Sequence, residues 1–87
     1  MPYIHKDKRS TIDFYLNSIL EQIDDKTCAG DLNYILTKII IAALGPNPNY
    51  DRYNSIVGML ECCKLELVRR KLSPYEDTKI ESNGDVY

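Results

Sequence analysis

The sequence predicts a mainly α fold: a small three-helix antiparallel bundle with a minor C-terminal β-hairpin or strand that is able to pair with the N-terminal segment. Three observations lead to this fold class. Apolar residues recur at helical spacing in three stretches, turn residues separate those stretches, and the spacing changes from helical to alternating after Pro74. With 87 residues, the chain is expected to form one domain over residues 1–87.

The first predicted helix covers about residues 10–25. Ser10 and Asp13 offer a cap for its N-terminus, and one face then carries apolar side chains at helical spacing. These side chains are Ile12, Leu16, Ile19, Leu20 and Ile23.

The second predicted helix covers about residues 31–44, with Asp31 as its cap and Gly45-Pro46 as its end. Ile41 lies off the main apolar stripe, so this helix is apolar around much of its circumference. Such a helix is central in the fold or meets a partner. The main stripe consists of Leu32, Ile35, Leu36, Ile39, Ile40, Ala43 and Leu44.

The third predicted helix covers about residues 50–72, starts at Asn49 or Asp51, and ends before Pro74. It has two apolar stripes, which suggests two neighbours. One stripe is Tyr53, Ile56, Val57, Leu60, Cys63, Leu67 and Val68, and the other is Met59, Cys62, Leu65 and Leu72.

Residues 75–87 are predicted to be an extended or hairpin tail, because Asn83-Gly84 matches a type I′ turn. The second strand would hold only three residues and would be marginal alone. Val86 and Tyr87 are therefore expected to dock on the N-terminal residues 1–4 or on a second subunit.

Composition excludes several classes of protein. The formal net charge of −2 argues against a protein that binds duplex nucleic acid. No apolar run is long enough to span a membrane, and the first ten residues lack the apolar stretch of a signal peptide, so a cytoplasmic location is expected. Three cysteines without paired spacing indicate reduced thiols. Small size and the apolar second helix favour a homo-oligomer.

The sequence offers no catalytic residues, no metal site and no cofactor motif, so a non-enzymatic protein is expected. His5 is the only histidine, and nothing pairs it with a nucleophile. Cys62 and Cys63 are adjacent, so on a helix they point about 100° apart and are expected to act as buried small apolar residues. The carboxylate pairs lack calcium-loop spacing, and the four glycines form no phosphate-binding loop.

The candidate ligand-binding residues are basic and aromatic. Arg69 and Arg70 stand near the end of the third helix, where they could hold an anion, and tyrosines could stack on a nucleobase. The alternative is that these arginines only complement the helix dipole or pair with Glu76 or Asp77. The predicted set is Tyr50, Arg52, Tyr53, Arg69 and Arg70.

Five fragments carry a resemblance to a known family: MPYI, GDLNY, GMLECCKLELVRR, YEDTKI and NGDVY. Over nearly its whole length, the chain resembles a family of short uncharacterised proteins from bacterial, archaeal and phage genomes that has no established function. The phage setting suggests an accessory role, such as neutralising a host defence.

We therefore expect a small non-enzymatic binding protein that sequesters an anionic small molecule, such as a nucleotide immune signal, at a subunit interface. One alternative is a protein–protein interaction module or inhibitor that acts through an apolar helix face or by strand addition. Another is a redox or hydrolytic enzyme that uses Cys62 or Cys63.

Overall fold

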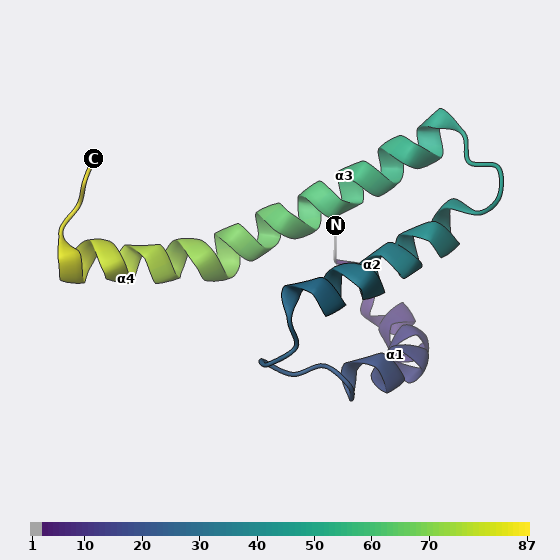
Figure 1. Ribbon diagram of the computed structural model, residues 1–87, viewed down its shortest axis with the longest axis horizontal. Helices are drawn as coiled ribbons and strands as arrows, with labels where there is room; N and C mark the ends of the chain where they lie inside the picture. Colours follow the sequence, from purple (N-terminus) through teal and green to yellow (C-terminus); the bar gives the residue numbers. More distant parts are fainter. Residues whose placement is uncertain (1–2) are drawn as a thin grey trace.

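The computed structural model describes residues 3–87, which are mainly helical and contain no strand (Figure 1). The prediction of a mainly α fold is confirmed. The third helix, its π-helical continuation and the last helix follow one another without a break as a single long helix. The elements are α1 (Lys6–Leu20), α2 (Ala29–Leu44), α3 (Tyr50–Leu67), the π-helix η1 (Val68–Leu72) and α4 (Ser73–Asn83).

The helix starts are capped by side chains, although not always the predicted ones. Asn49 caps α3 as one of the two expected residues, and its Oδ1 accepts from the Arg52 N–H at 2.8 Å. His5 caps α1, which begins before the predicted Ser10. Cys28 caps α2 through its sulfur, which leaves Asp31 in the first turn.

The predicted helix end before Pro74 is wrong, because the chain continues from η1 into α4. Proline has no N–H and is tolerated in the first turn of a helix, where that N–H would have no partner. Here the preceding turn is π-helical, and the Ser73 N–H donates to the Val68 carbonyl. This wider turn moves the backbone bonds so that Pro74 stands at the start of α4 rather than inside an unbroken α-helix.

The predicted C-terminal hairpin is also wrong. Asn83 is the last residue of α4, and Gly84 ends the helix with φ 92°, its N–H donating to the Ile80 carbonyl at 2.9 Å. An Asn-Gly pair satisfies both signals, since a helix C-terminus and a type I′ turn each need a residue with positive φ. Val86 and Tyr87 follow as an exposed segment without a strand partner.

The expected pairing of the N-terminal segment with the tail is not seen. Met1 and Pro2 lie outside the described residues, whereas Tyr3 lies near the middle of the long helix. Its hydroxyl donates to Glu66 Oε2 at 2.6 Å. The N-terminus is thus tied to a helix rather than to a strand.

The helices do not form the compact bundle that the sequence suggested. Between residues 3 and 87, backbone contact between helices is confined to α2 with α3 and to successive parts of the long helix, while α4 extends away from the rest (Figure 1). The radius of gyration is 16.8 Å, compared with about 12 Å for a compact chain of this length. Ile56 is the one residue of this region that counts as buried, at 9% exposure.

Candidate functional site

The predicted ligand-binding residues fall into two groups at opposite ends of α3 and η1. Tyr50, Arg52 and Tyr53 lie in the first turn of α3, and Arg69 and Arg70 lie in η1. Arg52 and Arg69 are therefore separated by about 25 Å along the helix axis. One small molecule cannot touch both groups within a single chain.

In the first group, Arg52 has a structural role, because it connects two helices. Its Nε donates to the Ala43 carbonyl at 3.0 Å, which joins the start of α3 to the last turn of α2. A cationic side chain on the last carbonyls of a helix also complements the helix dipole. Tyr50 and Tyr53 are exposed beside it. This group connects two helices and leaves two aromatic rings open to solvent.

In the second group, Arg69 is held by Glu66 one turn earlier. Nε of Arg69 donates to Oε1 at 3.2 Å and Nη2 donates to Oε2 at 3.0 Å. Tyr3 donates to Oε2 of the same carboxylate. Such a bidentate pair fixes the orientation of both side chains. We call these three residues the Glu66 clasp.

The Glu66 clasp changes the acid–base properties of its members in the expected directions. The hydrogen bonds from Arg69, then from Tyr3, lower the pKa of Glu66, because they stabilise the charged carboxylate. The same carboxylate raises the pKa of Arg69. Both groups are therefore charged throughout the neutral range, and the donors of Arg69 that face Glu66 are occupied.

Arg70 and Lys71 differ from Arg69, because neither forms an ion pair with any carboxylate of residues 3–87. The alternative that Glu76 or Asp77 would neutralise the arginines within the chain is not what the geometry shows. Arg69 instead forms its ion pair with Glu66. We call Arg69, Arg70 and Lys71 the basic turn, and its last two residues keep their charges available.

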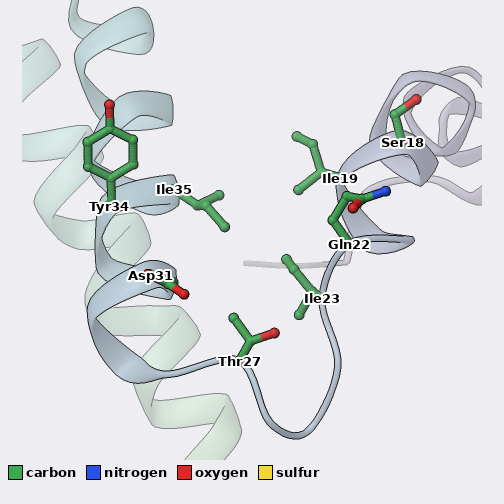
Figure 2. A pocket seen from close by; sticks show the side chains of 8 residues that line it. All are labelled: Ser18, Ile19, Gln22, Ile23, Thr27, Asp31, Tyr34 and Ile35. Carbon is green, nitrogen blue, oxygen red and sulfur yellow. The ribbon is translucent and has the colours of Figure 1, made fainter.

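A groove that the sequence analysis did not identify lies between α1 and α2 (Figure 2). Its volume is about 530 Å³. Ile19 and Ile23 point across it toward Ile35. The apolar stripes predicted for the first two helices contain all three isoleucines, so the stripes were a usable signal, but they were assigned to a closed core. The remaining lining residues are Ser18, Gln22, Thr27, Asp31 and Tyr34.

Apolar side chains are also exposed along α2 and the long helix. Ile41 is 57% exposed, in agreement with its predicted position off the main stripe of α2. Among residues 3–87, α3 is the one helix that contacts α2, so part of the apolar surface of α2 stays exposed. Other exposed apolar residues on these helices include Leu36, Ile39, Val57, Met59, Leu65, Leu67, Leu72 and Ile80.

The cysteines are free, and their surroundings differ from the expected buried positions. Cys62 is half-buried, while Cys28 and Cys63 are exposed. The Cys63 sulfur lies 3.8 Å from the Met59 sulfur. Across the part of the chain that the structure describes, no three His, Cys, Asp or Glu side chains come together as a metal site. No described helix is both long and apolar enough to span a membrane.

Comparison with known proteins gives one match. Residues 1–86 match the family described as a domain of unknown function, DUF6899. No curated protein and no solved structure matches the chain. Because the family match covers almost the whole sequence, the chain belongs to this uncharacterised family, as its resemblance to short proteins without an established function predicted.

Proposed function

We propose that the chain is a small non-enzymatic interaction protein that acts as a homo-oligomer through the open apolar faces of its helices. The observation that supports this function is the exposed area, 7926 Å² for a 10.0 kDa chain. A compact monomer of this mass exposes about 5,200 Å². The excess is about 2,700 Å² per chain, or about 5,400 Å² for two chains, which is at the upper end of the total area that obligate interfaces bury.

A second copy is the occupant that we propose for these faces. Each chain has too little buried apolar surface to offset the conformational entropy lost on folding. A symmetric interface lets one apolar surface cover the same surface on the other copy. The exposed residues of α2 and the long helix then become the core that a single chain lacks.

Native mass spectrometry of the full chain, together with light scattering after gel filtration, tests this function. We expect a mass that is a multiple of 10.0 kDa. We also expect the unfolding midpoint to rise with protein concentration, because association stabilises only the folded chain. A monomer that unfolds cooperatively at a midpoint independent of concentration would refute the proposal.

A second candidate function is capture of an anionic small molecule, such as a nucleotide, at the subunit interface. The observation that favours it is the pair of available cations, Arg70 and Lys71, in the basic turn. Arg69 is less suited, because its N–H groups already donate to Glu66. Exposed tyrosines at the start of α3 would have to come from another subunit, given their distance from η1.

Calorimetry with ATP and with inorganic phosphate tests the capture of an anion. We expect Arg70→Ala to weaken ATP binding at least about tenfold, in line with loss of a charge-assisted contact. Lys8→Ala, which removes the same charge from α1, is the matched control and should bind like the wild type. No heat from ATP with the wild-type chain would eliminate this candidate for that nucleotide.

A further inference from the structure

The groove between α1 and α2 has a size and a lining that suit a small ligand. Its volume is about 530 Å³, within the range of about 300–1,000 Å³ that holds small molecules in proteins. Ile19 and Ile23 form one wall and Ile35 forms the other, and their side chains point toward one another (Figure 2). Ile23 and Ile35 are half-buried. Apolar surface therefore faces the interior of the groove.

One end of the groove is closed by the connection between the two helices. Residues 21–28 join the end of α1 to the start of α2, and Ile23 and Thr27 of this connection line the groove. The N–H of Asp24 donates to Oγ1 of Thr27 at 3.0 Å, and the N–H of Lys26 donates to Oδ1 of Asp24 at 2.9 Å. The two walls are therefore joined at this end by a hydrogen-bonded turn.

The lining of the groove carries one charge, and it is negative. Asp31 is the charged residue, and no Lys, Arg or His of residues 3–87 lines the groove. Asp31 lies on the α2 wall, at a level between Thr27 and Ile35 (Figure 2). Its carboxylate forms no ion pair with any base of residues 3–87. The partial positive charge at the start of α2 offsets only about half of the carboxylate charge.

The negative charge extends beyond the lining residues to the whole closed end. Residues 21–31 hold four carboxylates and one base, for a net charge of −3, whereas the whole chain has −2. These residues are Glu21, Asp24, Asp25, Asp31 and Lys26. A cation near the closed end is therefore attracted by several carboxylates, and an anion is repelled. The apolar walls lower the local dielectric constant, which strengthens both effects.

We propose that the groove binds a small molecule with an apolar body and one positively charged end, such as an alkylammonium ion. The apolar body lies between the isoleucines of the two walls, and the charged end faces Asp31. Burial of the apolar body supplies most of the affinity, and Asp31 selects a cation over a neutral or negative ligand. This site goes beyond the proposed function, because it lies within one chain and is separate from the basic turn.

Three probes that share a six-carbon chain test the preference for a cation: hexylammonium, 1-hexanol and hexanoate. NMR of the full chain, labelled at the isoleucine methyl groups, follows each titration. We expect hexylammonium to shift the signals of Ile19, Ile23 and Ile35 at millimolar concentration, as is usual for so small a ligand. It should bind about fivefold more tightly than 1-hexanol, and hexanoate should bind more weakly than both. Ile41 is the internal control, because it is exposed on α2 and does not line the groove.

A substitution of Asp31 tests the charged end of the site. Asp31→Asn keeps the shape of the side chain and removes its charge, so hexylammonium should bind about fivefold more weakly and 1-hexanol should bind as before. Asp25→Asn is the matched control, since it removes the same charge at a residue that does not line the groove. There the affinity for hexylammonium should fall by less than about twofold, because salt screens a more distant exposed charge. Equal losses in the two variants would overturn the role of Asp31.

A substitution in the wall tests the apolar part of the site. Ile35→Thr should weaken hexylammonium and 1-hexanol alike, by about threefold, because it removes apolar surface from the groove. Ile41→Thr makes the same change on α2 outside the groove and should leave both affinities unchanged. Circular dichroism checks that both variants keep the helix content of the wild type. If Ile35→Thr does not, the three probes with the wild-type chain still decide.

Several results with the wild-type chain would overturn the site. Hexanoate that binds as tightly as hexylammonium would show that the groove does not select a cation. Shifts at Ile41 as large as those in the groove would show unspecific apolar binding. Groove signals that move when the free chain is diluted, but not when hexylammonium is added, would show that a second copy fills the groove. The site and the proposed homo-oligomer fail separately, because light scattering reports association and the methyl signals report the ligand.

Discussion

Two glycine substitutions test the backbone conformation at the end of α2 and the open space beside α3. Gly45 ends α2 with φ 69° and ψ −173°, a combination that other residues adopt at a cost of about 1–3 kcal/mol. An added Cβ at Gly45 would meet no atom within 4 Å, so that cost is entirely conformational. We expect Gly45→Ala to lower the free energy of unfolding by this amount.

Gly58→Ala is the matched control, with the same change of atoms in the interior of α3. There too a Cβ meets nothing within 4 Å, and alanine favours a helix over glycine by about 0.5–1 kcal/mol. Urea unfolding at one fixed protein concentration measures both. With a urea m-value of about 1 kcal/mol/M, we expect the midpoint to fall by about 1–3 M for Gly45→Ala and to rise by about 0.5–1 M for Gly58→Ala.

The essential result is that the two substitutions shift the urea unfolding midpoint in opposite directions. If Gly45→Ala unfolds at the wild-type midpoint, residue 45 does not need a positive φ at the end of α2. If Gly58→Ala is destabilised, the open space beside that residue is filled by another chain. Light scattering of the same variant then shows whether the loss is one of folding or of association.

Three further predictions concern the Glu66 clasp, the tail and the thiols. Because the folded pKa of Glu66 is lowered, its contribution to stability is complete above the unfolded pKa of about 4.3 and is lost as the pH falls through the folded pKa. Glu66→Gln should therefore make the unfolding midpoint depend less steeply on pH in the acid range. An unchanged pH dependence would contradict the Glu66 clasp. Deletion of residues 85–87 should leave the helix content by circular dichroism unchanged, because Val86 and Tyr87 are exposed; a loss of helix content would show that the tail supports α4. Peptide mass spectrometry after brief alkylation should find Cys28 labelled faster than the half-buried Cys62, and the reverse order would contradict the exposures of these thiols.

The first two-thirds of the fold could be predicted, because apolar residues there repeat at helical spacing. The end of α2 at Gly45-Pro46 and the cap at Asn49 are as expected, since each signal has one structural meaning at its position. After Pro74 the signals are ambiguous. Ile80 is the one aliphatic side chain between Pro74 and Asn83, so the spacing there carries almost no information about period.

The candidate site was less predictable than the fold, for two physical reasons. The pairing of Glu66 with Arg69 has a local signal in the sequence, because their spacing of three residues places them on neighbouring helical positions. The hydrogen bond from Tyr3 has no such signal, because it joins residues 63 positions apart in sequence. Contacts of this kind depend on tertiary packing, and no local pattern encodes them.

The two candidate functions are separable by linkage. An anion held between two copies binds only the associated chain, so it strengthens self-association by the same factor by which self-association strengthens anion binding. Light scattering with increasing ATP at constant ionic strength therefore tests both: a rising mass indicates a nucleotide held between two copies, and a constant mass together with binding by calorimetry indicates an anion held outside the interface.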